Sequence, residues 1–324
     1  MINAIRVHQT GGPEVLDYEQ VEIGEPGPGQ AKVRHEAIGL NFIDVYFRTG
    51  LYKAEQLPFT PGNEGAGIVV AVGSGVDNVR VGDRVAYVTT PGSYADERIV
   101  PAERLVRVPD NIDLKTAAGM MLKGMTAQYL LRSTFNVKPG QTILFHAAAG
   151  GVGLIAGQWA RHLGATVIGT AGSPEKIALA KQHGYDHVIN YRSENFVEKV
   201  RELTDGKGVD VVYDSVGRDT YMGSLDVLKP RGLLACFGQS SGLIPPFDLG
   251  TLSQKGSLFI TRPTLFHYIA TRPELEAAAN GLFDVVGSSA VKIEVNQSYA
   301  LNDVRTAHED LEARKTTGTT ILLP

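Results

Sequence analysis

The sequence contains very little cysteine. Cys236 is the single cysteine among 324 residues, so an intrachain disulfide and a thiolate-rich metal site are both excluded. It lies in the apolar run Leu-Leu-Ala-Cys-Phe, where a buried and unreactive thiol is the expected state. The chain must therefore gain its stability from hydrophobic cores, for which 43% hydrophobic residues are available.

The sequence also lacks an excess of charge of one sign. Its 31 basic and 35 acidic residues give a net charge of −4, and no long run of either sign occurs. This balance disfavours nucleic acid and membrane surfaces as main partners. No signal peptide or membrane-spanning segment is visible near the N-terminus, where Arg6 and His8 already interrupt the first predicted strand, so we expect a cytoplasmic protein.

A glycine-rich turn is the most informative feature that is present. Residues 142–153 read Thr-Ile-Leu-Phe-His-Ala-Ala-Ala-Gly-Gly-Val-Gly, and apolar residues then recur at helical spacing. Ala148, Gly150 and Gly153 occupy the three positions of the Gly-x-Gly-x-x-Gly pattern, with alanine in place of the first glycine. Such glycines allow a tight turn, close approach of backbone N–H groups to a pyrophosphate, and close packing of helix on strand. The turn therefore predicts a dinucleotide cofactor.

The segments after the turn continue the alternation of strands and helices. This order predicts an α/β domain with a doubly wound parallel sheet, the Rossmann fold. The expected strands are 166–170, 188–190, 209–213, 233–237 and 257–261, and the expected helices are 175–184 and 194–204.

The residues at the end of the second strand favour NADPH over NADH. NAD-specific folds carry an acidic residue about 20 positions after the glycines, where it binds the ribose hydroxyls. Here that region contains Ser173 and Lys176, while Glu175 is expected in the first turn of the next helix. A hydroxyl and a cation suit a 2′-phosphate, and Tyr191 and Arg192 could complete the pocket. The alternative is that Lys176 is an ordinary solvated helix residue.

The rest of the chain differs from this domain in composition and in its hydrophobic pattern. The first 120 residues are rich in glycine and proline and contain short alternating stretches, which predict a compact all-β unit. Later residues show short helices, strands near 290–295 and 318–323, and no second glycine-rich turn. We therefore expect a first domain at 1–122, a dinucleotide-binding domain at 123–265, and a return segment at 266–324 that completes the first domain.

Five motifs connect the chain to a known superfamily. They are Gly-Leu-Asn-Phe-Ile-Asp (39–44), Pro-Gly-Asn-Glu-Gly-Ala-Gly-Ile-Val (61–69), Val-Gly-x-x-Val (72–76), Val-Gly-Asp-Arg-Val (81–85) and the Ala-Ala-Ala-Gly-Gly-Val-Gly turn. In order and spacing the chain resembles the medium-chain dehydrogenase/reductase superfamily. It is most similar to the zinc-independent quinone oxidoreductases related to ζ-crystallin. The resemblance implies a GroES-like β domain and a Rossmann domain, with the active cleft between them.

The resemblance also bears on a catalytic metal. Zinc-dependent members of the superfamily bind zinc through a cysteine at the position of Asn41, a histidine at that of Asn63, and a cysteine or acid near Lys123. An asparagine carbonyl is a poor zinc ligand and a lysine carries a positive charge, so the sequence predicts no metal site. Without a Lewis acid, alcohol oxidation is disfavoured. The expected acceptor takes hydride unaided, as a quinone or an α,β-unsaturated carbonyl does.

The expected catalytic residues lie in and after the first motif. The resemblance places Asn41 against the nicotinamide, and its amide could donate to the oxygen that becomes negative as hydride arrives. Tyr46 and Tyr52 offer flat rings with a hydroxyl, and Asp44 could orient one of these groups. The proton that the acceptor needs could come from a tyrosine or from water. Packing in the core or at a dimer interface is the alternative explanation for both tyrosines.

The remaining cofactor contacts are implied by the resemblance. Arg314, just before the last predicted strand, would reach the cofactor, although by its position alone it is a solvated helix end. His146, within an apolar strand, is expected to be structural. The full set of predicted cofactor-binding residues is Asn41, Thr126, Gly150, Gly151, Val152, Gly153, Leu154, Gly172, Ser173, Lys176, Tyr191, Arg192, Phe237, Gly238, Gln239, Ser240 and Arg314.

Together these features predict a zinc-independent NADPH:quinone oxidoreductase. The competing enzymatic hypothesis is NADPH-dependent reduction of alkenals, enones or enoyl thioesters, although no basic cluster suited to a thioester tail occurs outside the NADPH region. A non-enzymatic role as a crystallin-like or RNA-binding protein is a third hypothesis, and the charge balance disfavours RNA. A homodimer is expected, because the late strands at 233–237 and 257–261 offer an apolar sheet edge.

Overall fold

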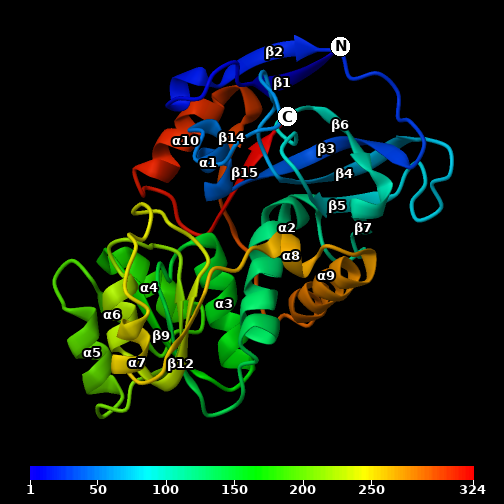
Figure 1. The fold of residues 1–324 in the computed structure, drawn as a ribbon. Coiled ribbons are helices and arrows are strands. Elements are labelled where there is room, and N and C mark those ends of the chain that lie inside the picture. Colours follow the sequence, from blue (N-terminus) through cyan, green and yellow to red (C-terminus); the bar gives the residue numbers. More distant parts are fainter. The chain divides into compact units, whose positions relative to one another are not determined.

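The computed structural model describes residues 1–324 and places them in two units (Figure 1). Unit 1 consists of Met1–Met125, Ile269–Gly287 and Ile293–Pro324, and unit 2 consists of Thr126–Tyr268 and Ser288–Lys292. The first boundary falls within helix α2 (Leu114–Tyr129).

Residues 288–292 belong to unit 2, although the sequence predicted them in the first domain. The reason is a pair of hydrogen bonds between Gln158 and the backbone of Lys292. Gln158 Nε2 donates to the Lys292 carbonyl at 3.0 Å, and the Lys292 N–H donates to Gln158 Oε1 at 2.9 Å. The Gln158 side chain thus holds the segment Ser288–Lys292 against unit 2.

Unit 2 contains a six-stranded sheet in which every strand pairing is parallel, as predicted. The strand order is β10-β9-β8-β11-β12-β13. The strands are β8 (Thr142–Phe145), β9 (Thr166–Ala171), β10 (His187–Asn190), β11 (Val209–Asp214), β12 (Leu228–Cys236) and β13 (Phe259–Thr261). The helices are α3 (Gly151–His162), α4 (Pro174–Gln182), α5 (Phe196–Leu203), α6 (Tyr221–Asp226), α7 (Gly250–Gln254) and α8 (Leu265–Tyr268), and a π-helical turn (Leu130–Thr134) follows α2.

The strand order defines where this sheet binds ligands. From β8 the chain runs outward to β10 and then returns to β11 on the other side of β8. In doubly wound sheets the ligand lies at the carboxyl ends of the strands where the order reverses. The turn after β8 therefore lies at the position that a dinucleotide requires.

Unit 1 is built around a seven-stranded, mostly antiparallel sheet with the order β14-β15-β3-β4-β5-β7, and β6 pairs with β3. Its strands are β3 (Gln30–Leu40), β4 (Glu64–Val72), β5 (Arg84–Val88), β6 (Glu97–Pro101), β7 (Leu105–Arg107), β14 (Val295–Ala300) and β15 (Thr319–Leu323). A separate hairpin pairs β1 (Ile2–Arg6) with β2 (Asp17–Val21). The helices are α1 (Phe42–Arg48), the first part of α2, α9 (Arg272–Gly287) and α10 (Val304–Glu312), with 3-10 turns at Pro13–Val15, Ala102–Arg104 and Leu301–Asp303.

One predicted strand is misplaced in the sequence analysis. The sequence predicted a strand near 290–295, whereas the structure has β14 at Val295–Ala300. β14 is an edge strand with mostly polar residues, and it is held by parallel pairing with β15. Pairing with a neighbouring strand, rather than apolar periodicity, decides its position.

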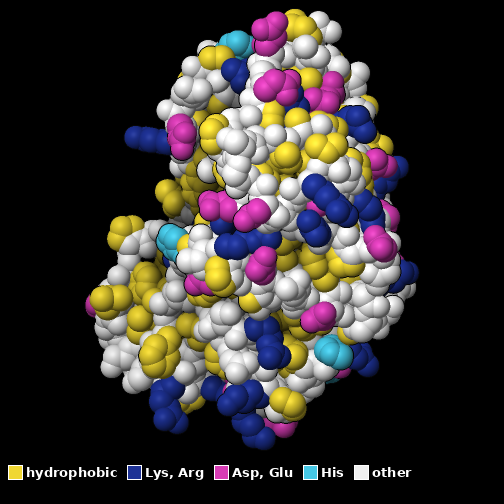
Figure 2. All heavy atoms as spheres, turned by 90° about the vertical axis from the view of Figure 1, so that its right-hand side faces the viewer, with side chains coloured by type: hydrophobic (Ala, Val, Ile, Leu, Met, Phe, Trp, Pro, Cys, Tyr) yellow, Lys and Arg dark blue, Asp and Glu magenta, His cyan; other side chains and the backbone are white.

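The surface carries charges of both signs. Basic and acidic side chains are mixed over much of the face shown in Figure 2, as a net charge of −4 leads one to expect. None of the helices is both long and apolar enough to cross a bilayer.

Candidate active site

The glycine-rich turn joins the end of β8 to the start of α3. Gly153 has no room for a side chain, because a Cβ atom there would lie 2.5 Å from the carbonyl oxygens of both Ala147 and Ala148. Alanine fits at position 148 because Gly169 on β9 faces it, and a Cβ at position 169 would lie only 2.7 Å from that of Ala148. The turn therefore packs closely on β9 because Gly169, which has no side chain, takes the role of the absent first glycine.

The N-terminus of α3 suits an anionic ligand. Gly150 is the N-cap residue and offers no side-chain oxygen to the first N–H groups of the helix. Those N–H groups, together with the positive end of the helix dipole, bind the pyrophosphate in dinucleotide folds. Gly150, Gly151 and Val152 are partly exposed, whereas Gly153 and Leu154 are buried. The first three residues can therefore contact a ligand directly.

Most of the residues predicted to bind a 2′-phosphate lie close to the end of β9, whereas Arg192 follows Tyr191 and is exposed. Tyr191 lies against the backbone of Gly172, where a Cβ atom would be 2.4 Å from the tyrosine oxygen. Ser173 is the N-cap residue of α4 and accepts a hydrogen bond from the Lys176 N–H at 3.4 Å. Glu175 lies in the first turn of α4, is exposed, and has its pKa lowered by a hydrogen bond with Ser173. Glu175 therefore begins a helix, as predicted, but its carboxylate contacts Ser173 beside the predicted phosphate site.

The other predicted cofactor residues are spread over both units. Phe237 and Gly238 follow β12, and their N–H groups donate to the carbonyl oxygen of the last residue of β11 at 2.9 and 3.4 Å. Thr126 is buried in α2. Arg314 belongs to unit 1, is exposed, and adopts a left-handed backbone conformation, with φ of 60°, just after α10.

Two residues near the turn that look reactive are structural, as predicted. The ring nitrogens of His146 each lie 3.0 Å from a hydroxyl, those of Thr170 and Ser224, and burial lowers the pKa of this imidazole. Burial, followed by the charge of Asp214, raises the pKa of the Cys236 thiol to about 12. The hydrogen bonds of His146 and the position of Cys236 in the core of unit 2 account for both residues.

In unit 1, Asn41 connects β3 to α1 and is held from two directions. Its Nδ2 donates to Glu64 Oε1 at 3.0 Å, and its backbone N–H donates to Asp44 Oδ2 at 2.9 Å. Gly39 leaves room for this arrangement, because a Cβ atom there would lie 1.9 Å from Glu64 Oε1. Sequence reasoning did not select Glu64, although it directly follows Asn63 in the second motif.

A buried ion pair is formed by Lys123, one of the three positions that the resemblance aligned with zinc ligands. Lys123 Nζ lies 3.1 Å from Glu64 Oε1 and donates to the carbonyl of Leu40, also at 3.1 Å. Glu64 Oε2 accepts from the backbone N–H of Leu122. Both carboxylate oxygens are therefore engaged, and the neighbouring groups are amides and an ammonium. These residues do not fit a zinc ion.

Asp44 is fully buried on α1, and opposing effects act on the pKa of its carboxyl group. Its Oδ2 accepts from Asn41 and from the Tyr94 hydroxyl, the latter at 2.8 Å, whereas its Oδ1 has no hydrogen-bond partner. Burial raises the pKa of Asp44 to about 7, and the charge of Glu64 adds to this rise. The two hydrogen bonds and the Lys123 ammonium oppose it.

The predicted substrate tyrosines belong to an aromatic cluster. The ring centroids of Tyr46 and Tyr52 lie 5.1 Å apart, and those of Phe42 and Phe47 lie 5.4 Å from Tyr46 and 5.8 Å from Tyr52, respectively. Tyr46 is 9% exposed and Tyr52 is half-buried. The rings pack on one another and still leave part of Tyr52 open to a ligand.

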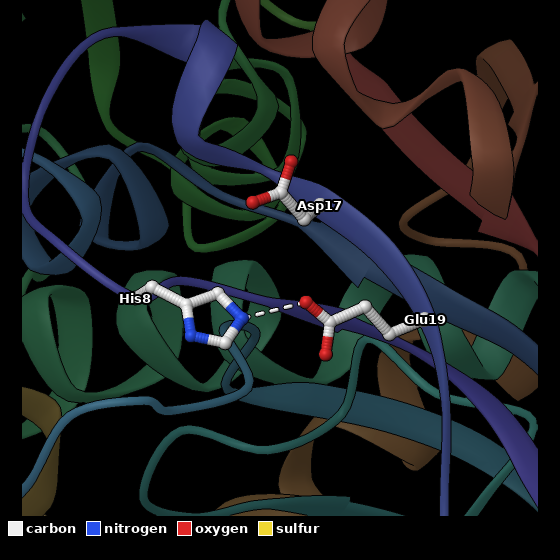
Figure 3. Close-up of side chains that lie close together, drawn as sticks. All are labelled: His8, Asp17 and Glu19. Carbon is white, nitrogen blue, oxygen red and sulfur yellow. Dashed lines mark hydrogen bonds and ion pairs between the residues drawn. The ribbon is translucent and has the colours of Figure 1, made fainter.

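A further group of potential metal ligands lies on the surface of unit 1 (Figure 3). His8 Nε2 and Glu19 Oε1 are 2.6 Å apart, and Asp17 lies beside them on β2. Asp17 Oδ1 is paired with Arg305 at 2.7 Å. Each carboxylate thus has a basic partner, and surface ion pairs account for the cluster.

Comparison with known proteins adds to this geometry. A family model described as "Alcohol dehydrogenase GroES-like domain" matches residues 27–110, and one described as "Zinc-binding dehydrogenase" matches residues 151–292. A quinone oxidoreductase of Pseudomonas aeruginosa is 54% identical over the full length of both chains. The crystal structure of Escherichia coli quinone oxidoreductase complexed with NADPH has a TM-score of 0.98 at 49% identity, covering 99% of this chain and all of the other. A 2-haloacrylate reductase of a Burkholderia species is 47% identical and covers this chain fully, with 99% of its own length.

A GroES-like domain followed by a parallel-sheet dinucleotide domain defines a medium-chain dehydrogenase/reductase. Within that superfamily, the chain belongs to the quinone oxidoreductase family. The range that matches the zinc-binding dehydrogenase model, 151–292, includes none of Asn41, Asn63 and Lys123.

The balance at Asp44 leads to a prediction about stability. The folded-state pKa of about 7 lies above the ordinary value of 3.8, so folding takes up a proton between these pH values. The contribution of this group to stability is fully present below pH 3.8 and is lost as the pH rises through 7, at about 1.4 kcal/mol per pH unit. Asp44→Asn carries no charge and lacks this dependence.

Urea unfolding of both proteins from pH 4 to pH 8 measures the effect. The stability of Asp44→Asn relative to the unmodified protein should rise steadily up to about pH 7 and then level off. A difference that stays constant over this range would show that Asp44 does not exchange a proton on folding.

Proposed function

We propose that this protein is a cytoplasmic, zinc-independent oxidoreductase that uses NADPH to reduce quinones. The observation that carries the proposal is the full-length likeness to a quinone oxidoreductase solved with NADPH. The chemistry after β9 supports the same cofactor, because Ser173 and Lys176 offer a hydroxyl and a cation and no carboxylate ends the strand.

When bound, NADPH supplies a hydride. The part of unit 2 is to hold the cofactor. The uncapped N-terminus of α3 at Gly150–Val152 binds the pyrophosphate, and Ser173 and Lys176 bind the 2′-phosphate, with Tyr191 beside them.

The part of unit 1 is to bind the acceptor and stabilise the charge that develops on it. The Asn41 amide has two N–H groups, of which one binds Glu64 at 3.0 Å and the other makes only a 3.5 Å contact to the Gly39 carbonyl. That second N–H is the donor for the acceptor oxygen. The Lys123 ammonium is paired with Glu64 and helps to hold the Asn41 amide through this carboxylate. Tyr46 and Tyr52 bind the flat ring, and the proton comes from a tyrosine hydroxyl or from water.

Reduction of an α,β-unsaturated acid is a second candidate function. The specific observation in its favour is the 2-haloacrylate reductase at 47% identity over the full chain. Hydride addition to a conjugated double bond also places negative charge on a carbonyl oxygen, so the same Asn41 donor serves both reactions.

Parallel assays of the purified, metal-stripped protein test both functions. We expect fast oxidation of NADPH with a simple 1,4-quinone, slower oxidation of NADH, and no effect of a chelator, because no residue in the site binds zinc. A 2-haloacrylate, a 2-alkenal and an enoyl thioester are the other acceptors, and a primary alcohol with NADP is the control for zinc-type chemistry. Turnover confined to the unsaturated acceptors would reject the quinone and support the second function.

The cofactor preference gives a second measurement. In Lys176→Ala the KM for NADPH should rise roughly ten- to hundredfold, because a charge-assisted phosphate contact of about 1.5 to 3 kcal/mol is lost. The KM for NADH should change little, since NADH has no 2′-phosphate. Lys181→Ala, in the last turn of the same helix, is the matched control and should leave both values unchanged. Equal effects of Lys176→Ala on the two cofactors would place the phosphate elsewhere.

We also propose a homodimer that forms along the edge of the unit 2 sheet. β13 pairs with β12 on one side only, which leaves its other edge open. Phe259 on this strand is 61% exposed. An open, apolar strand edge is a site for pairing with a second copy.

Sedimentation of the unmodified protein should therefore give the mass of two chains. Phe259→Lys introduces a charge at the proposed interface and should shift the equilibrium to monomer. Leu203→Lys, at a partly exposed position on α5, is the control and should remain dimeric. A monomer in the unmodified protein, or dissociation by both variants alike, would contradict the proposed interface.

A further inference from the structure

Buried polar side chains form a continuous path from α10 to the start of α1 in unit 1. Arg48 NH1 lies 3.0 Å from His308 Nδ1, and His308 Nε2 lies 3.1 Å from the Tyr94 hydroxyl oxygen. That hydroxyl lies 2.8 Å from Asp44 Oδ2, which also accepts the Asn41 N–H. Figure 1 shows α10 and α1 near each other in unit 1. The path joins residues that are far apart in the sequence.

Elementary chemistry fixes the direction of every hydrogen bond in this path. A guanidinium only donates, so His308 Nδ1 must accept and the neutral ring carries its proton on Nε2. Burial, followed by the charge of Arg48, lowers the pKa of His308 to about 3, so the ring is neutral at physiological pH. His308 Nε2 therefore donates to Tyr94, and the Tyr94 hydroxyl is left to donate to Asp44.

The outer end of the path is fixed in place. Arg48 Nε donates to the Gly11 carbonyl at 3.2 Å, and Arg48 NH2 lies 2.8 Å from a carboxylate oxygen of Glu312 at the end of α10. The Arg48 side chain is 1% exposed. Because Arg48 is buried, always charged and bound to Gly11 and Glu312, it orients the His308 ring.

At the inner end of the path, no other group can replace the hydrogen bond from Tyr94 to Asp44. Asp44 Oδ1 has no hydrogen-bond partner, so the Asn41 N–H and the Tyr94 hydroxyl are the two donors to this side chain. The charged groups that face Asp44 are Glu64 and Lys123, and Arg48 lies beyond His308. Loss of the Tyr94 hydroxyl would leave the carboxylate with one donor in a buried site.

We propose that Tyr94 and His308 are positioning residues for hydride transfer, because they orient the Asp44 carboxyl group that binds the backbone N–H of Asn41. The role in hydride transfer rests on the proposed function of Asn41. The hydrogen-bond path itself does not. In this arrangement, helix α10 influences the position of Asn41 through His308. His308 itself does not touch the quinone substrate.

Tyr94→Phe tests the proposal by two independent measurements. The first is the titration of Asp44 by ¹³C NMR of labelled aspartate carboxyls, with its signal identified by its absence in Asp44→Asn. Loss of a hydrogen bond to a charged group should raise the apparent pKa of Asp44 from about 7 by about one to two units. The second is the pH profile of kcat/KM for NADPH-dependent quinone reduction, whose acidic limb should move upward by the same amount.

Tyr87→Phe is the matched control. Tyr87 is another buried tyrosine of unit 1 whose hydroxyl contacts a buried histidine, at 2.7 Å from His35 Nε2, and it makes no hydrogen bond to Asp44. It should lower the melting temperature and leave both pH-dependent readouts unchanged. If Tyr94→Phe fails to fold, His308→Asn removes the donor to Tyr94 and should shift both readouts in the same direction by a smaller amount.

The outcomes separate this proposal from the proposed function. No quinone turnover by the unmodified protein would reject the function, while the NMR titration would still test the path. A shifted titration with an unchanged pH profile would overturn the positioning role. Equal behaviour of Tyr94→Phe and Tyr87→Phe in both readouts would show that Tyr94 only stabilises the fold.

Discussion

The buried ion pair between Lys123 and Glu64 is the interaction on which the candidate site depends. It joins α2 to β4, and through the Leu40 carbonyl and the Asn41 amide it also joins both to the end of β3. Removing one partner of such a pair costs about 3 to 5 kcal/mol, because the other charge stays buried without compensation. The resemblance described above implies that zinc-dependent members of the superfamily hold their metal at the positions of Asn41, Asn63 and Lys123. Here an ammonium paired with a carboxylate makes the connection, and neither group is a Lewis acid.

This exchange limits the chemistry of the site. A metal polarises an oxygen by direct bonding, whereas Lys123 and Asn41 act through hydrogen bonds and charge. Such a site suits acceptors whose own conjugation spreads the incoming negative charge. The similarity to both quinone oxidoreductases and a 2-haloacrylate reductase agrees with that limit, since both substrates are conjugated.

The sequence predicted features that are encoded locally and missed those that depend on distant contacts. The turn at 148–153, the parallel order of unit 2 and the placement of Glu175 in a helix follow from short spacings. The role expected for Asn41 came from the resemblance. Tyr94 and His308 gave no signal, because they are 214 residues apart and meet only in the fold. The position of β14 was wrong because an edge strand depends on its neighbour and less on its own apolar pattern.

The return of the chain to unit 1 has a consequence for synthesis on the ribosome. β15 lies between β14 and β3, so the central sheet of unit 1 lacks two of its strands until Thr319–Leu323 has been made. Unit 2 needs nothing beyond Lys292. During translation, unit 2 can therefore fold before unit 1 is complete. Until β15 has been synthesised, the part of β3 that pairs with it remains unpaired. All residues of unit 2 are thus synthesised before unit 1 is complete, although unit 1 begins first.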